Sequence, residues 1–136
     1  MKLQIGKKKI DEIESLIETN CWKAMAWIHA VLHRQLKYLF YYGKERSKGD
    51  HEKKWKLVDK EICYKFDSAR KICYIKNLIN KTDSRELKAF NTFRNQKVGH
   101  PNIYEYLPED EKVITACEKG FKLIKKLDNK LTKIFF

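Results

Sequence analysis

The sequence predicts an all-α protein, a single HEPN-like or otherwise simple bundle of about five helices over residues 1–136 is not yet the point; the fold class comes first, from three observations.

Glycine and proline number only five and two, whereas all-β and doubly wound folds use both freely in turns and crossovers. Apolar residues recur at helical spacing along most of the chain. The length of 136 residues suits one compact domain and is too short for a (β/α)₈ barrel, which needs about 250 residues. These observations together predict an all-α domain, a small bundle of about five helices.

The first two helices are predicted from their apolar residues. One face of the segment 7–19 carries Ile10, Ile13, Leu16 and Ile17. Asn20 is a suitable N-cap for a second helix over about 21–42, which we expect to end at Gly43. The apolar residues of this second helix cover more than one face, as is typical of a helix at the centre of a fold or in an interface.

The middle of the chain is predicted to hold a loop and two shorter segments. Residues 44–54 are polar and highly charged and contain Gly49, which predicts a mobile loop. Residues 55–66 carry enough apolar side chains for a short helix. We expect Asp67 or Ser68 to cap the segment that follows, which is apolar up to residue 79.

Two further helices are predicted in the second half. Residues 81–84 indicate a turn with a capping residue, before a helix that reaches about Val98. Gly99 and Pro101 form a helix stop, and residues 102–108 a connector. The acidic residues at 109–111 suit the start of a last helix, whose apolar residues again recur at helical spacing.

Charge and targeting signals narrow the possible partners. Lysine and arginine exceed the acidic residues by 30 to 18, a net charge of +12, which favours RNA, DNA or an acidic protein. The chain has no apolar run of about 20 residues, so we expect no membrane span. A signal peptide is not indicated, so we expect a cytoplasmic protein. Its four cysteines are then expected to be reduced, buried and free of disulfides.

The segment 93–101 carries the residues with the clearest chemical potential. Arg94 and Asn95 fall in the last turns of the predicted helix, and His100 follows the stop at Gly99. Because glycine adopts positive φ at little cost, the chain can turn there and bring the imidazole back towards the guanidinium. The guanidinium offers a fork of donors to a phosphate, and an imidazole can exchange a proton near neutral pH.

The same spacing also fits a purely structural role. Arg94 would then pair with an acidic surface residue, and His100 would cap the carbonyl groups at the helix end. Spacing alone leaves both interpretations open.

The segment also resembles the R-x(4–6)-H motif of the HEPN superfamily (higher eukaryotes and prokaryotes nucleotide-binding domain). Five residues separate Arg94 from His100, Asn95 directly follows the arginine, and Pro101 follows the histidine, as is common in the family. The motif lies before the final helix of a short helical chain, as in the family. Toxin members often carry a tyrosine two residues after the histidine, whereas Tyr104 lies four residues after His100.

The resemblance implies a metal-independent endoribonuclease that needs no cofactor and acts as a homodimer on single-stranded RNA. His100 would transfer protons, Arg94 would stabilise the phosphorane, and Asn95 would orient the phosphate. Lys97 and Tyr104 are predicted RNA contacts. A toxin or defence role with an antitoxin or nucleotidyltransferase partner is the expected setting. The alternative is a non-catalytic module that binds a nucleotide or a partner protein.

Three other groups of residues carry weaker signals. His29 and His33 have a metal-ligand spacing, but a satisfied pair on a helix face is the preferred interpretation, and no metal is expected. Aromatic packing is preferred over base stacking for the tyrosines at 38, 41 and 42. A solvated face is preferred over phosphate contact for a basic stripe that consists of Lys122, Lys125, Lys126, Lys130 and Lys133.

Overall fold

The computed structural model describes residues 6–44, 51–98 and 110–135 of the chain. These residues form helices and no strands, which confirms the predicted all-α class. The elements are α1 (Lys7–Thr19), α2 (Cys21–Lys44), α3 (His51–Leu57), the π-helix η1 (Val58–Ile62), α4 (Phe66–Ile75), α5 (Lys81–Val98) and α6 (Glu111–Phe135). The described part therefore holds six α-helices, where the sequence predicted about five.

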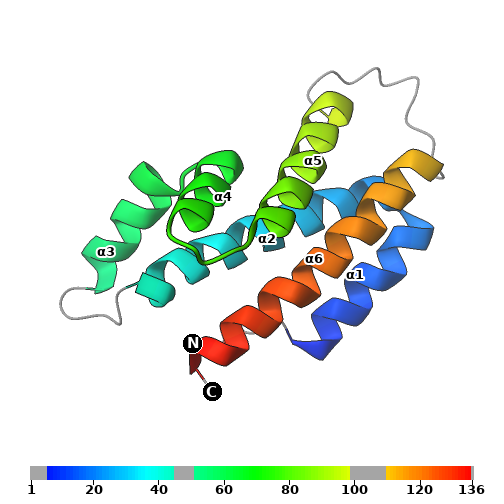
Figure 1. Cartoon of the computed structure of the whole chain (residues 1–136). Coiled ribbons are helices and arrows are strands. Elements are labelled where there is room, and N and C mark those ends of the chain that lie inside the picture. The colour runs from blue at the N-terminus through cyan, green and yellow to red at the C-terminus, as the bar shows by residue number, and fades with distance from the viewer. Residues whose placement is uncertain (1–5, 45–50, 99–109, 136) are drawn as a thin grey trace.

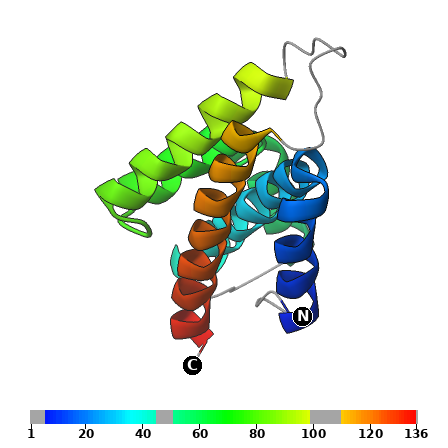
Figure 2. The same ribbon diagram turned by 90° about the vertical axis from the view of Figure 1, so that its right-hand side faces the viewer.

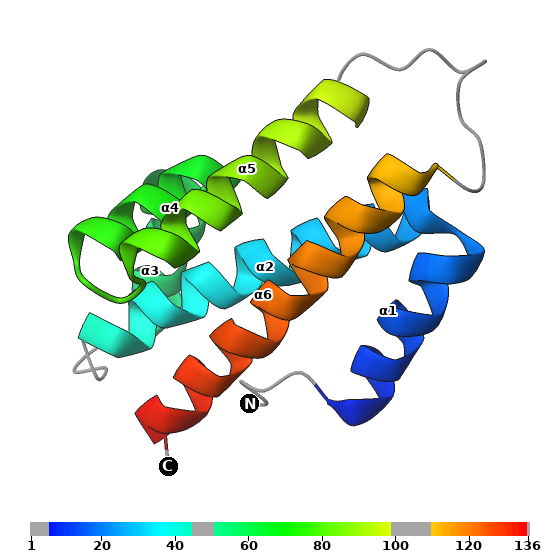
Figure 3. The same cartoon turned by 45° about the vertical axis from the view of Figure 1, so that its right-hand side comes forward.

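Helix α2 is the centre of the bundle (Figure 1). It packs most extensively against α6 and also contacts α1 and α4. Figure 2 shows α1 running alongside α6, and Figure 3 shows α5 and α6 crossing the same central helix. The apolar residues of α2 that point inward, such as Met25, Ile28 and Leu32, are fully buried. A helix enclosed on several sides needs apolar residues on more than one face, as the sequence of α2 has.

Gly43 does not end α2, contrary to the prediction. The helix continues to Lys44, and a Cβ atom at position 43 would lie 2.6 Å from Cδ2 of Leu78. The glycine therefore gives Leu78, which follows α4, room to approach the helix backbone.

The predicted loop over 44–54 is shorter than expected. Lys44 belongs to α2, and α3 begins at His51, so the remaining part of the loop, 45–50, lies outside the described residues. The short helix predicted over 55–66 is a continuation of α3 into the π-helix Val58–Ile62. The backbone amide of Cys63 closes η1 on the carbonyl of Val58 at 2.7 Å.

Neither Asp67 nor Ser68 caps α4. The N-cap is Lys65, without a side-chain cap, and Asp67 lies in the first turn of the helix. Its carboxylate instead accepts a hydrogen bond from Nε of Arg70 at 2.9 Å. Arg70 also donates through Nη1 to Ser84 at 2.8 Å, so this buried arginine ties α4 to α5.

The turn predicted at 81–84 is the first turn of α5. Asn80 caps this helix, because its side-chain oxygen accepts the backbone N–H of Asp83 at 2.7 Å. The predicted end near Val98 agrees with the observed bounds of α5. The helix stop at Gly99 and Pro101 and the connector over 102–108 lie outside the described residues.

The cap predicted for α2 and the acidic start of α6 are both confirmed. The side chain of Asn20 accepts the backbone N–H of Lys23 at 3.2 Å. The carboxylate of Asp110 accepts the backbone N–H groups of Lys112 and Val113 at 3.0 and 3.3 Å. A carboxylate at this position also interacts favourably with the helix macrodipole.

All four cysteines are buried and free, as predicted. Burial raises the pKa of Cys63 to about 11 and that of Cys117 to about 12. Burial also raises the pKa of Cys73. The thiols therefore behave as small apolar groups in the core.

The additional aromatic surface of α2 is covered within the single chain. Tyr41 stacks on Trp55 of α3 with ring centroids 4.6 Å apart, and the ammonium of Lys9 in α1 lies 3.6 Å from the Trp27 ring centroid. This surface therefore gives no physical argument for the predicted homodimer. None of the described helices carries an apolar stretch that would span a bilayer.

Candidate functional site

Arg94 lies near the end of α5, as the sequence predicts, and is half-buried. Its Nη1 donates to Oδ1 of the exposed Asn95 at 3.2 Å. Its Nε is buried and has no hydrogen-bond partner among the described residues. No carboxylate of the described residues pairs with this guanidinium, so its remaining donors are available to an anion.

His100 and Tyr104 lie outside the described residues, so the structure does not bring Arg94 and His100 together or separate them. Lys97 is half-buried on the last turn of α5. Its ammonium lies 5.7 Å from the ring centroid of Phe93, which is a cation–π distance.

His29 of α2 lies on the inner side of the arginine. Its Nε2 donates to Oδ1 of Asn91 in α5 at 2.9 Å, and its ring stacks on Phe66 with centroids 4.6 Å apart. Burial lowers the pKa of His29, and the positive charge of Arg94 lowers it further, although the hydrogen bond to Asn91 raises it. The imidazole is therefore neutral near pH 7, and Arg94 is the charged member of this group.

His33 is satisfied separately from His29. Its Nε2 donates to the backbone carbonyl of Cys63, at the end of η1, at 2.7 Å. The interpretation of the two histidines as a satisfied helix-face pair is thus confirmed. Within the ranges that the structure describes, no group of three His, Cys, Asp or Glu residues is arranged to hold a metal ion.

Sequence reasoning missed the contact of His29 with the Arg94 region. Asn91 and Arg94 are three residues apart, so the helical period alone places them on neighbouring positions of one face. His29, however, is 62 residues before Asn91, and only the packing of α2 beside α5 brings the two side chains together.

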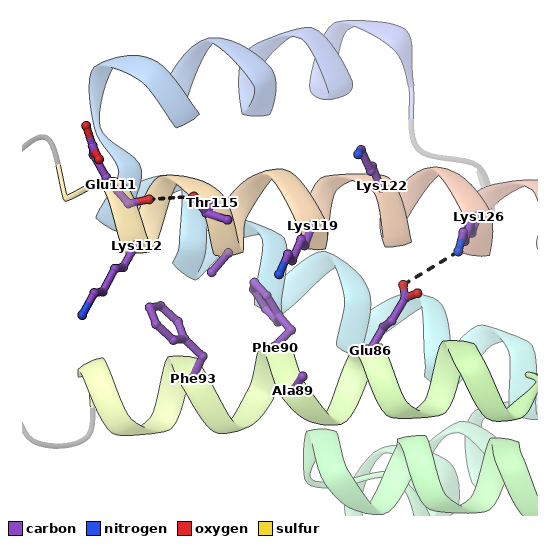
Figure 4. Close-up of a pocket in the computed structure, with 11 residues that line it drawn as sticks. Glu86, Ala89, Phe90, Phe93, Glu111, Lys112, Thr115, Lys119, Lys122 and Lys126 are labelled. Atoms are coloured by element: carbon purple, nitrogen blue, oxygen red, sulfur yellow. Dashed lines mark hydrogen bonds and ion pairs between the residues drawn. The ribbon is translucent and has the colours of Figure 1, made fainter.

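A groove of about 840 Å³ lies between α5 and α6, on the side of α5 that carries Phe93. Figure 4 shows Phe90 and Phe93 rising from α5 towards α6, with Lys112 and Lys119 extending from α6 towards α5. Ala89 and Ala116 complete the apolar part of the lining. The volume is within the range of about 300–1,000 Å³ that is typical of ligand pockets.

The predicted tyrosine packing is confirmed. Tyr38 and Tyr41 are buried, and the Tyr38 ring meets Trp55 edge-on with centroids 5.0 Å apart. The hydroxyl of Tyr38 accepts two hydrogen bonds from Arg34, at 2.9 and 2.8 Å. These rings are engaged with one another and with α3, which leaves base stacking to other aromatic residues.

The basic stripe of α6 is solvated only in part. Lys122, Lys125 and Lys133 are exposed. Lys126 and Lys130 instead reach Asp83 of α5, at 3.8 and 3.7 Å. Because Asp83 is buried, these two ion pairs help to hold α6 against α5.

Comparisons with protein-family models, with curated proteins and with solved structures find no match to this chain.

Proposed function

We propose that the protein is a metal-independent endoribonuclease that cleaves single-stranded RNA, with Arg94, Asn95 and His100 as its catalytic residues. The observation that carries the proposal is the Arg94 guanidinium, which has a buried Nε without a partner and no carboxylate beside it among the described residues. An arginine in this state suits a phosphate, because its donors match the phosphate oxygens in geometry and charge.

The proposed reaction begins at the ribose 2′-OH. His100 removes the proton, the 2′-oxygen forms a bond to phosphorus, and the bond from phosphorus to the 5′-oxygen breaks. A proton from an imidazole completes the 5′-OH of the leaving strand, and the other product ends in a 2′,3′-cyclic phosphate. Arg94 stabilises the additional negative charge of the phosphorane, and Asn95 orients the phosphate.

The electrostatics around Arg94 support this role. His29 stays neutral beside the guanidinium, since burial lowers the pKa of its imidazole. The net charge of +12 favours the approach of a polyanion. A homodimer, a cytoplasmic location and an antitoxin or nucleotidyltransferase partner are parts of the same proposal and rest on the family resemblance.

The test is cleavage of single-stranded RNA in EDTA by wild type, Arg94→Ala and His100→Ala. Loss of a general acid or base costs about 10²–10⁴-fold, and loss of one transition-state donor about 10²–10³-fold. Arg85→Ala is the matched control, because Arg85 is an exposed arginine on the same helix. We expect it to cut like wild type. Equal rates for wild type and His100→Ala would refute the proposal and favour the non-catalytic binding module.

A further inference from the structure

The groove between α5 and α6 has an excess of available positive charge. Lys112 and Lys119 have no carboxylate partner among the described residues, whereas Lys126 is paired with Glu86 at 3.8 Å. Seven residues separate Lys112 from Lys119, so both lie on one face of α6, about 10 Å apart along the helix. This spacing presents two cations along the length of the groove.

The opposite wall offers an aromatic surface. Phe90 is buried, but Phe93 is only half-buried and lines the groove. The ammonium of Lys97 near the Phe93 ring connects this wall with the turn of α5 that carries Arg94. A basic strip opposite an aromatic ring is the combination that binds single-stranded nucleic acid, because phosphates pair with the cations and bases stack on the ring.

We propose that this groove binds the nucleotides of a single-stranded RNA next to the phosphate held at Arg94. A base stacks on Phe93, and the phosphates on either side of it pair with Lys112 and Lys119. The choice of RNA as the ligand rests on the proposed function. The groove itself extends the site from one phosphate to a short stretch of the strand.

The lining favours RNA over an acidic helix of a partner protein. A helix that docks in a groove inserts apolar side chains at i, i+3 or i+4, and i+7 into apolar surface. Here the apolar lining consists of two rings and two alanine methyl groups, and the two unpaired lysines stand opposite the more exposed ring. A strand that alternates phosphates with flat bases matches this arrangement.

The test measures binding of a 2′-O-methyl RNA oligonucleotide, which has no free 2′-OH and so cannot be cleaved. We expect Lys112→Gln/Lys119→Gln to weaken binding about 10- to 30-fold at 0.1 M salt and to reduce the slope of log affinity against log salt by about 1.4, which is 0.7 for each of two phosphates. Lys125→Gln/Lys133→Gln is the matched control, with the same charge loss on the same helix outside the groove. Equal losses in the two variants would overturn the proposal.

Position 93 provides a second test. Phe93→Leu keeps an apolar side chain but removes the ring face, and we expect about tenfold weaker binding, with wild-type affinity for Phe93→Tyr. Wild-type affinity for Phe93→Leu would overturn the proposal. An acidic amphipathic peptide that loses affinity in the Lys112/Lys119 variant while RNA does not would assign the groove to a protein partner instead.

Binding and cleavage are separated by this design. If wild type fails to cut ordinary RNA but the groove variants weaken binding of the 2′-O-methyl strand, the nuclease proposal fails and the groove proposal stands. If wild type cuts RNA while the groove variants bind normally, the groove proposal alone fails.

Discussion

Replacing Gly120 by alanine tests how closely α6 packs in the core. A Cβ atom at this position would lie 2.7 Å from Cγ2 of Ile28 and 2.8 Å from Cε2 of Phe90, where ordinary contacts are 3.4–4 Å. Both neighbours are buried and have little room to move. Overpacking of this kind costs about 2–3 kcal/mol, and the higher helix propensity of alanine returns about 1 kcal/mol. We therefore expect a net loss of about 1–2 kcal/mol and a fall in Tm of about 4–8 °C.

Gly43→Ala is the matched control for this prediction. The new Cβ would lie 2.6 Å from Cδ2 of Leu78, but this atom ends a flexible, half-buried side chain that can rotate away. We expect the free energy of unfolding to change by less than about 0.5 kcal/mol. Urea unfolding followed by circular dichroism compares the two variants. If Gly120→Ala is as stable as Gly43→Ala, the close approach of α6 to Ile28 and Phe90 is wrong.

Three further predictions concern pH, thiols and a helix cap. Burial lowers the pKa of His29 and His33 below 6.5, so the unfolded chain binds protons first as the pH falls; we expect stability to decrease below about pH 6.5 and His29→Gln to lose less between pH 7.5 and 5.5, and an equal loss would contradict this. A thiol reagent at pH 8 should label the native protein slowly and the unfolded protein at all four cysteines, because burial raises the pKa of Cys63 to about 11; rapid labelling of native protein would count against the buried thiols. Asn80→Ala should cost about 1 kcal/mol in urea unfolding, whereas Asn80→Asp keeps the acceptor and should be nearly neutral.

The helices with a one-sided apolar pattern could be predicted from the sequence. The bounds of α1 and the end of α5 agree with the prediction, because burial of one face decides where a helix forms. The first turn of α3 was missed because residues 51–54 are polar and show no apolar period. Gly43 was interpreted as a stop because a sequence does not reveal that Leu78 will approach it.

The candidate site was predicted only where it is local in sequence. Arg94 and Asn95 are neighbours at the end of a helix with a clear apolar face, so their placement could be derived. His29 joins them through tertiary packing, and the groove forms where lysines of α6 face phenylalanines of α5. In the sequence, these phenylalanines resemble ordinary core residues, and the lysines resemble an ordinary solvated face.

The end groups of the RNA fragments test the central proposal most directly. Wild-type protein is incubated with a single-stranded RNA oligonucleotide in EDTA, beside a DNA oligonucleotide of the same sequence, and the products are analysed by mass spectrometry. The proposal predicts RNA fragments with 2′,3′-cyclic phosphate and 5′-OH ends, none from Arg94→Ala on the same timescale, and intact DNA. Cleavage of the DNA, fragments with 3′-OH ends, or RNA that stays intact would contradict it.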